Sequence, residues 1–134
     1  MSPNPGPKVQ DIVAALDTAF PTQWAEPWDN VGLAVGDPAA HVTGVLVCLD
    51  VTREAVSRAA EQGLNVVVTH HPAFLDPAGA FGPGSVATLA LSQGIALIAA
   101  HTNLDRAPAG ARVLADALGL ADVQPLERSL QTMS

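Results

Sequence analysis

Apolar and amphipathic segments alternate along residues 43–120, and this order limits the folds that the chain can adopt. Three continuously apolar segments have the length and the valine and isoleucine content of buried strands: VTGVLVCLDV, NVVVTHH and IALIAAH. Each is followed by a helical sequence: TREAVSRAAEQG, SVATLALSQG and AGARVLADALGL. A β-α-β-α-β-α order favours parallel strands joined by right-handed crossovers. Strands that are apolar on both sides predict helices on both faces of the sheet, so we expect an α/β fold with a mostly parallel sheet.

Helix-ending signals support these boundaries. Thr52 and Ser85 stand where N-caps are expected, and glycines close the three helices, at Gly63, Gly94 and Gly119. Upstream, apolar residues at helical spacing predict a helix over 8–20 that Pro21 stops. VGLAVG alternates and predicts a short strand. Residues 1–7 are rich in proline and predict a flexible arm, which leaves residues 8–134 as one folded unit.

Composition narrows the function classes. The chain has 134 residues, and its 49% hydrophobic content is enough for a core. It has 6 basic against 13 acidic residues, which argues against nucleic acid and favours a small or metal-bridged ligand. Cys48 is the only cysteine, and in an apolar run it is expected to be a small core residue. We see no secretory signal and no run long enough to span a membrane, so we expect a cytoplasmic protein without membrane contact.

Polar residues follow the predicted parallel strands. Asp50 ends the first strand, His70 and His71 end the second, and His101 ends the third, with Asp105 four residues later. In an open parallel sheet, ligands bind in the crevice beyond the carboxyl ends of the strands. The topology therefore predicts that these side chains lie at one edge of the sheet.

Histidine and carboxylate without thiolate form a ligand set for Zn, Fe or Mn. Adjacent residues on a strand point to opposite sides, and Pro72 should hold His71 extended. The pair His70–His71 is thus expected to reach two different divalent ions, about 3.5–4 Å apart in a two-metal site. Asp105 is expected to bind one ion or to bridge both.

Other polar residues leave alternatives open. We interpret His41 as structural, and His101 as either a ligand or a proton-transferring residue. Asp50 either lines the site or caps the next helix. Asp29 and Asn30 lie in a loop with two tryptophans and are candidates to line the site.

Several motifs together resemble a known family. WDNVGLAVGDP, VLVCLDVT, VVVTHHPAFL, AAHTNLDRAPAG and LADALGL occur in the order typical of the Nif-three-like dinuclear metal-binding family. Members of this family are known as GTP cyclohydrolase I type 2 homologues. The resemblance covers residues 8 to about 120.

The resemblance implies an α/β protein whose two similar halves face each other across a cleft with two metal ions, assembled into toroidal hexamers. It implies that His70 and His71 each bind one metal, that Asp105 is the aspartate ligand, and that His101 lines the cleft. The WDNVGL segment, with Asp29 and Asn30, matches a loop near that site.

The family pattern also includes a second half, with a His-x-x-x-Glu motif that completes the metal site. This motif does not follow His101, and the sequence stops at Ser134. We therefore expect a truncated product, a split gene or a fragment, with a separate chain as one source of the missing half.

Three functions stay open at this point. The first is a metal-dependent hydrolase of a nucleotide-like or phosphorylated small molecule, with His101 as general acid or base. The second is a metal-dependent regulatory or binding protein, with Trp24 and Trp28 at an interface. The third is an inactive half-domain.

Overall fold

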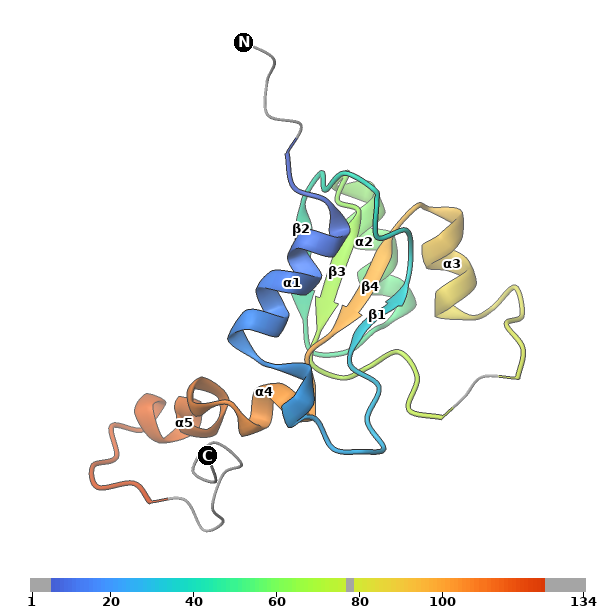
Figure 1. The fold of residues 1–134 in the computed structure, drawn as a ribbon. Coiled ribbons are helices and arrows are strands. Elements are labelled where there is room, and N and C mark those ends of the chain that lie inside the picture. The colour runs from blue at the N-terminus through green and yellow to red at the C-terminus, as the bar shows by residue number, and fades with distance from the viewer. Residues whose placement is uncertain (1–5, 77–78, 125–134) are drawn as a thin grey trace.

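The computed structural model describes residues 6–76 and 79–124 of the protein (Figure 1). Within these ranges the elements are, in chain order, α1 (Val9–Ala19), the 3-10 turn η1 (Thr22–Trp24), β1 (Gly32–Val35), β2 (Val45–Cys48), α2 (Arg53–Glu61), β3 (Val66–Thr69), α3 (Val86–Ser92), β4 (Ala96–Ala99), α4 (Thr102–Arg106) and α5 (Pro108–Ala117). Residues 1–5 of the predicted arm lie outside the described residues. Pro7 is held to the domain, since its carbonyl accepts a hydrogen bond of 2.8 Å from the Val42 N–H.

The four strands form one mostly parallel sheet in the order β1-β4-β3-β2. Strands β2, β3 and β4 are parallel, with Val47 beside Val68 and Val68 beside Ile98. Strand β1 lies at the other edge, antiparallel to β4, with Leu33 opposite Ile98. The predicted α/β class with a mostly parallel sheet is therefore confirmed, and one antiparallel pair is added to it.

Helices cover both faces of the sheet, because successive residues of each buried strand point to opposite sides. Val66 and Val68 of β3 pack in a core cluster with Val9 of α1. Val67 points the other way and packs in a second cluster with α2 and α3, to which Val56 and other residues contribute. Figure 1 shows α1 on one side of the sheet and α2 and α3 on the other.

Strand β2 differs from the prediction of a buried strand. Its side chains alternate between exposed and half-buried, and 75% of Val47 and 58% of Leu49 are exposed to solvent. The physical reason is its place at the edge: α1 packs over β3 and β4, so among the described residues no helix covers one apolar face of β2.

The predicted helix ends are found where capping chemistry requires them. The Thr52 side chain accepts a hydrogen bond from the Ala55 N–H and caps α2, and Ser85 caps α3 in the same way. Gly63 follows α2 with a φ of +69°, a left-handed conformation that favours glycine. The short elements η1 and α4 were not predicted, because three to five residues carry no helical periodicity.

The parallel strands β2, β3 and β4 end at the same edge of the sheet, with Cys48, Thr69 and Ala99 as their last residues. Helices α4 and α5 continue beyond this edge, at the lower left of Figure 1. The polar residues that follow the strands are thereby brought to one side of the domain.

Candidate metal centre

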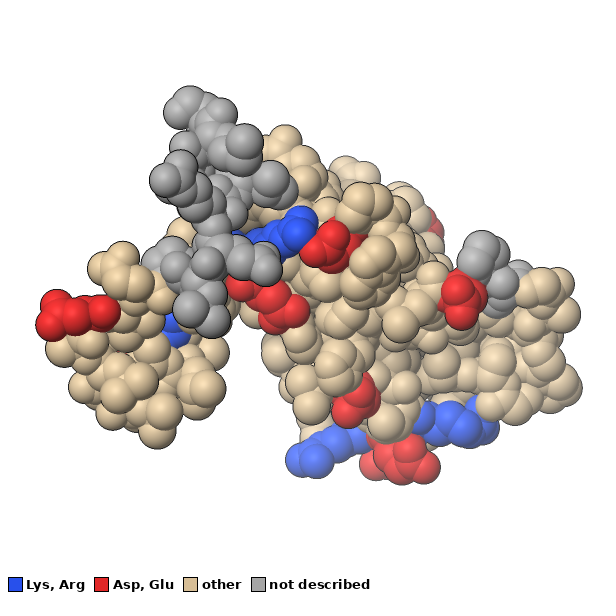
Figure 2. Space-filling view, turned by 90° about the horizontal axis from the view of Figure 1, so that it is seen from below, with Lys and Arg blue, Asp and Glu red and all other residues tan. Residues whose placement is uncertain are grey.

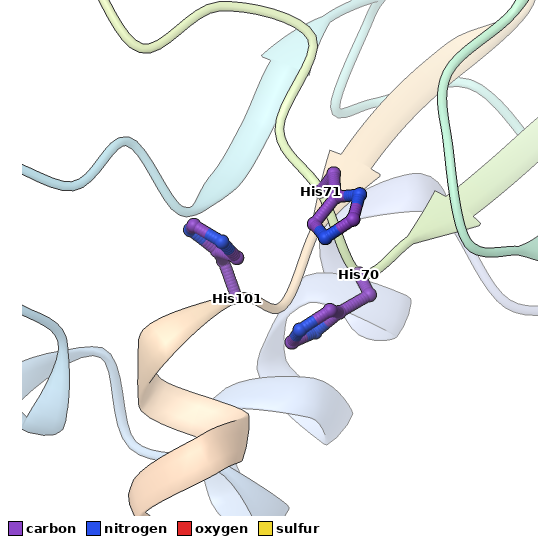
Figure 3. Close-up of side chains that lie close together, drawn as sticks. All are labelled: His70, His71 and His101. Atoms are coloured by element: carbon purple, nitrogen blue, oxygen red, sulfur yellow. The ribbon is translucent and has the colours of Figure 1, made fainter.

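Three histidine rings gather beyond the carboxyl ends of β3 and β4 (Figure 3). His70 and His71 follow β3, and His101 follows β4 and precedes α4. The ring centroids lie 5.1 Å (His70–His71), 5.2 Å (His70–His101) and 5.6 Å (His71–His101) apart. One nitrogen of each ring lies within 4.8 Å of the others, a spacing at which the three imidazoles can bind metal.

The adjacent histidines do not point to opposite sides, as a continued strand would require. Strand β3 ends at Thr69, and the Thr69 hydroxyl donates to the His71 carbonyl at 2.7 Å across a bend in the backbone. Both imidazoles therefore face the same space, and the simple alternation rule for strands does not apply to them.

The Nδ1 atom of His70 lies 3.0 Å from the carbonyl oxygen of Ala100. A carbonyl only accepts, so Nδ1 carries the proton and Nε2 of the neutral ring has a lone pair. This Nε2 atom lies 3.4 Å from Oδ1 of Asp105, which is also an acceptor. Two lone pairs that face each other at this distance repel, and a proton or a cation between them would relieve the repulsion.

His71 is held by Asp50. The Nδ1 atom of His71 lies 2.6 Å from Asp50 Oδ1, while Thr52 supplies the helix cap. Of the two roles considered for Asp50, the structure therefore shows the contact with a site histidine. Both side chains are about half exposed, 47% for His71 and 59% for Asp50.

Asp29 holds the third ring from a loop 72 residues away in sequence. Its side chain is fully buried, and Oδ1 lies 3.0 Å from Nδ1 of His101 and 2.8 Å from the Asn30 N–H. Oδ2 accepts from the backbone N–H of Thr102 at 3.0 Å and from the Thr102 hydroxyl. Burial raises the pKa of Asp29, but hydrogen bonds from Thr102, His101 and Asn30 outweigh it and hold the pKa below its ordinary value.

The remaining predicted residues lie around this cluster. The Asn30 side-chain amide donates to the Phe74 carbonyl at 3.1 Å and links the two loops that border the site. Trp28 is 59% exposed, and its ring meets the His101 ring edge-on at 6.2 Å. His41 is not in the cluster; its carbonyl accepts from Asn65 at 2.7 Å.

Thr102 is a member of the site that the sequence reading missed. Its hydroxyl accepts from the Glu26 N–H at 2.9 Å and donates to Asp29. Arg106, one turn later, pairs with Glu26 and donates to the Trp24 carbonyl at 3.0 Å. The segment after His101 is polar, which could have indicated that its side chains make hydrogen bonds. The spacing of its residues did not indicate that their partners lie in the tryptophan loop.

Cys48 lies beside the site without the properties of a metal ligand. Its thiol donates to the Asp50 carbonyl at 3.4 Å, and its side chain packs against the α2–α3 core cluster. Burial, and to a lesser extent the charge of Asp50, raise the pKa of the thiol, which therefore keeps its proton at neutral pH.

The chain matches the model of one protein family over residues 7–133, nearly its whole length: Duf34/NIF3 (NGG1p interacting factor 3). It belongs to the Duf34/NIF3 family. The resemblance drawn from the sequence motifs is thereby confirmed.

A curated Duf34/NIF3 relative from Staphylococcus aureus (strain MRSA252), named GTP cyclohydrolase 1 type 2 homolog, is 42% identical over 120 residues. The match covers 87% of this chain and 33% of the relative, so the chain spans about a third of the length of the curated relatives it matches.

Solved structures agree with the fold. A Bacillus cereus protein related to NIF3 matches with a TM-score of 0.84 and 35% identity, over 90% of this chain and 35% of that one. Reduced HcgD from Methanocaldococcus jannaschii matches with a TM-score of 0.82 and 30% identity, over 92% of this chain and 51% of that one.

On the face shown in Figure 2, basic side chains stand singly or beside acidic ones and form no continuous patch. An apolar groove of about 400 Å³ borders His70, lined among others by Leu16, Phe20, Val47 and Leu49. Within the described residues, every helix is too short or too polar to cross a membrane.

Proposed function

We propose that the chain is the metal-binding portion of a metal-dependent hydrolase and that it binds divalent ions of the Zn, Fe or Mn class. On the family resemblance, His70 and His71 would each hold one of two ions, and Asp105 would bind the ion of His70 or both ions. The donor set of imidazole and carboxylate, without thiolate, fits this class of ions.

One observation carries the proposal. The Nε2 lone pair of His70 faces a carboxylate oxygen of Asp105 at 3.4 Å. The Nδ1–H group of His70 donates to the Ala100 carbonyl. Two ligands that each lie ~2.1 Å from one tetrahedral ion are ~3.4 Å apart. This spacing is compatible with two ligands of one ion, and a partner fixes the tautomer of the histidine, as is usual for metal-binding histidines.

Bound ions would polarise a substrate oxygen and favour the loss of a proton from water near neutral pH. The protein's own side chains would bind and orient the substrate and would transfer protons. His101 donates its Nδ1 proton in a hydrogen bond to Asp29 and offers Nε2 as a proton acceptor beside the other two rings. Trp28 borders the same space and would limit the access of water and substrate to it.

The substrate class follows from the relatives and is proposed for the whole protein, of which this chain resembles about a third. Several relatives are named GTP cyclohydrolase 1 type 2 homolog, and we propose hydrolysis of a nucleotide-like or phosphorylated small molecule. A second polypeptide or segment would supply the further ligands of the site. Assembly into a hexamer is proposed on the family resemblance alone.

Metal analysis tests the central claim. The purified chain is treated with chelator and titrated calorimetrically with Zn²⁺ and Mn²⁺, together with His70→Ala, His71→Ala and the control His41→Ala. We expect binding by the wild type and the control, and loss of at least one site in the other two variants. Equal binding by all four proteins would overturn the proposal.

A second candidate function is metal-dependent association without catalysis. It is favoured by apolar side chains exposed near the site, namely Trp28 at 59%, Val47 at 75% and Leu49 at 58%. Its test is the mass of the assembly by light scattering with metal and with chelator. A metal-dependent mass together with no turnover of nucleotides or phosphoesters would favour this candidate.

A further inference from the structure

The buried carboxylate of Asp29 has no role in the proposed metal binding, yet it is the most completely hydrogen-bonded acid at the site. Its side chain is 0% exposed, and each of its oxygens accepts from a backbone N–H, Asn30 on Oδ1 and Thr102 on Oδ2. Backbone N–H groups are always donors, so both oxygens must act as acceptors.

The other two contacts have the same direction. The Thr102 hydroxyl already accepts from the Glu26 N–H, so it donates its own proton to Asp29. The fourth contact is His101 Nδ1, 3.0 Å from Oδ1. An oxygen that accepts from every other partner accepts here as well, which leaves the His101 proton on Nδ1 and the lone pair on Nε2.

We propose that Asp29 is a positioning residue that fixes His101 in the Nδ1–H tautomer and so keeps the lone pair of its Nε2 atom free to accept a proton. It acts only through His101, and its value for catalysis rests on the proposed function. The site thus has one tautomer for all three rings, each fixed by a different acceptor: the Ala100 carbonyl, Asp50 and Asp29.

The structure offers internal references for a test. His70 and His71 have acceptors of their own and should not respond to a change at Asp29. His41 lies outside the cluster and serves as the control histidine, whose signal should not change. Thr102 belongs to the same hydrogen-bond network but does not contact Nδ1, so Thr102→Ala damages the network and leaves the His101 acceptor in place.

The experiment is a two-bond ¹H–¹⁵N correlation spectrum of the metal-free full chain labelled with [¹⁵N]histidine, recorded at a pH where the four rings are neutral. The wild type is expected to show His101 in the Nδ1–H tautomer. Asp29→Ala should turn this signal into a mixture that includes the Nε2–H tautomer, while His70 and His71 stay unchanged. Thr102→Ala should keep the wild-type pattern at His101.

An Nε2–H tautomer at His101 in the wild type would overturn the proposal, as would an unchanged tautomer in a folded Asp29→Ala variant. The same tautomer change in both alanine variants would also overturn it, since Asp29 would then act only as part of the local structure. If Asp29→Ala does not fold, an Nε2–H tautomer in the wild type still overturns the proposal. Because no metal is present in this experiment, its result is independent of the metal titration. The tautomer proposal can be wrong while the chain binds metal, and it can be right while the chain does not.

Discussion

Nε2 of His70 and Oδ1 of Asp105 face each other at 3.4 Å, although neither atom has a proton to donate when the ring is neutral. An amide in place of the carboxylate would present a weaker ligand or an N–H group to that lone pair. We therefore expect Asp105→Asn to lower the affinity for Zn²⁺ by more than the ~10–100-fold that loss of an outer partner of a ligand costs.

Calorimetric titration measures this affinity, and Asp116→Asn is the matched control. Asp116 pairs with Arg112 on the surface of α5 at 3.2 Å and does not contact the three histidines. Equal affinities in the two variants would contradict the assignment of Asp105.

The contact between Asp50 and His71 leads to a graded prediction. Asp50 fixes the tautomer of His71 at 2.6 Å but is 59% exposed, so water can replace part of its role. We expect Asp50→Asn to lower Zn²⁺ affinity about tenfold, less than Asp105→Asn does. A larger loss at Asp50, measured in the same titrations, would make this carboxylate a ligand.

The lowered pKa of Asp29 predicts how stability depends on pH. A carboxyl whose pKa is lower in the folded chain stabilises it above the unfolded pKa of about 3.9, and this contribution is lost as pH falls through the folded pKa. Asp29→Asn should therefore cost about 1–3 kcal/mol of unfolding free energy at pH 7, because an NH₂ group replaces one oxygen and the donors that face it lose their acceptor. The gap to wild type should shrink below about pH 4.

Urea unfolding of the metal-free proteins at pH 7 and pH 3 measures this gap. Asp17 is a reference on the surface: the backbone and side chain of Thr22 lower its pKa, so Asp17→Asn should show the same sign with a smaller effect. If the difference in unfolding free energy between wild type and Asp29→Asn is the same at pH 7 and pH 3, the charge of Asp29 does not stabilise the fold.

The pattern of apolar segments was sufficient to predict the core of the domain. The valines of β3 and the apolar run of β4 are continuous because both strands lie between helices, and that continuity is visible in sequence. The exposure of Val47 is not visible in the sequence, because β2 has the same apolar composition as the buried strands. Only its place at the edge of the sheet distinguishes β2 from them. Composition does not report strand order.

The gathering of the three histidines followed from topology, because parallel strands end at one edge. The orientation of the histidine rings did not follow from topology, because the chain bends directly after Thr69 and the alternation of side chains along a strand no longer applies. The contact of Asp29 with His101 joins residues 72 positions apart, and no local pattern encodes such a pair.

A buried and an exposed leucine are expected to respond differently to the same substitution. Leu97 on β4 is 2% exposed, whereas Leu91 on α3 is 61% exposed. Leu97→Ala should cost about 2–5 kcal/mol of unfolding free energy by leaving a cavity, and Leu91→Ala should stay within about 0.5 kcal/mol. Denaturant titration of both variants checks this, and similar costs would place the core elsewhere.

At Gly36 both the backbone conformation and a neighbouring strand oppose a side chain. Its φ is +114°, and a Cβ atom there would lie 2.7 Å from the Ala96 Cα atom in β4. Gly63 also has a positive φ, of +69°, but a Cβ atom would meet nothing within 4 Å. Gly63→Ala should cost about 1–2 kcal/mol from backbone strain alone, and Gly36→Ala clearly more. Thermal unfolding ranks the two, and the reverse order would contradict the packing of β1 on β4.

The loop that contains Asp29 reaches α4 through contacts between residues 72 to 76 positions apart, including the bond from Glu26 to Thr102. Contacts between such distant residues close slowly, because the loop entropy is lost before the contact forms. The third imidazole is therefore fixed only when the loop that contains Asp29 has packed against α4. A metal that needs His101 in place would bind the finished domain and not a nascent one, and its capture would report the completion of folding.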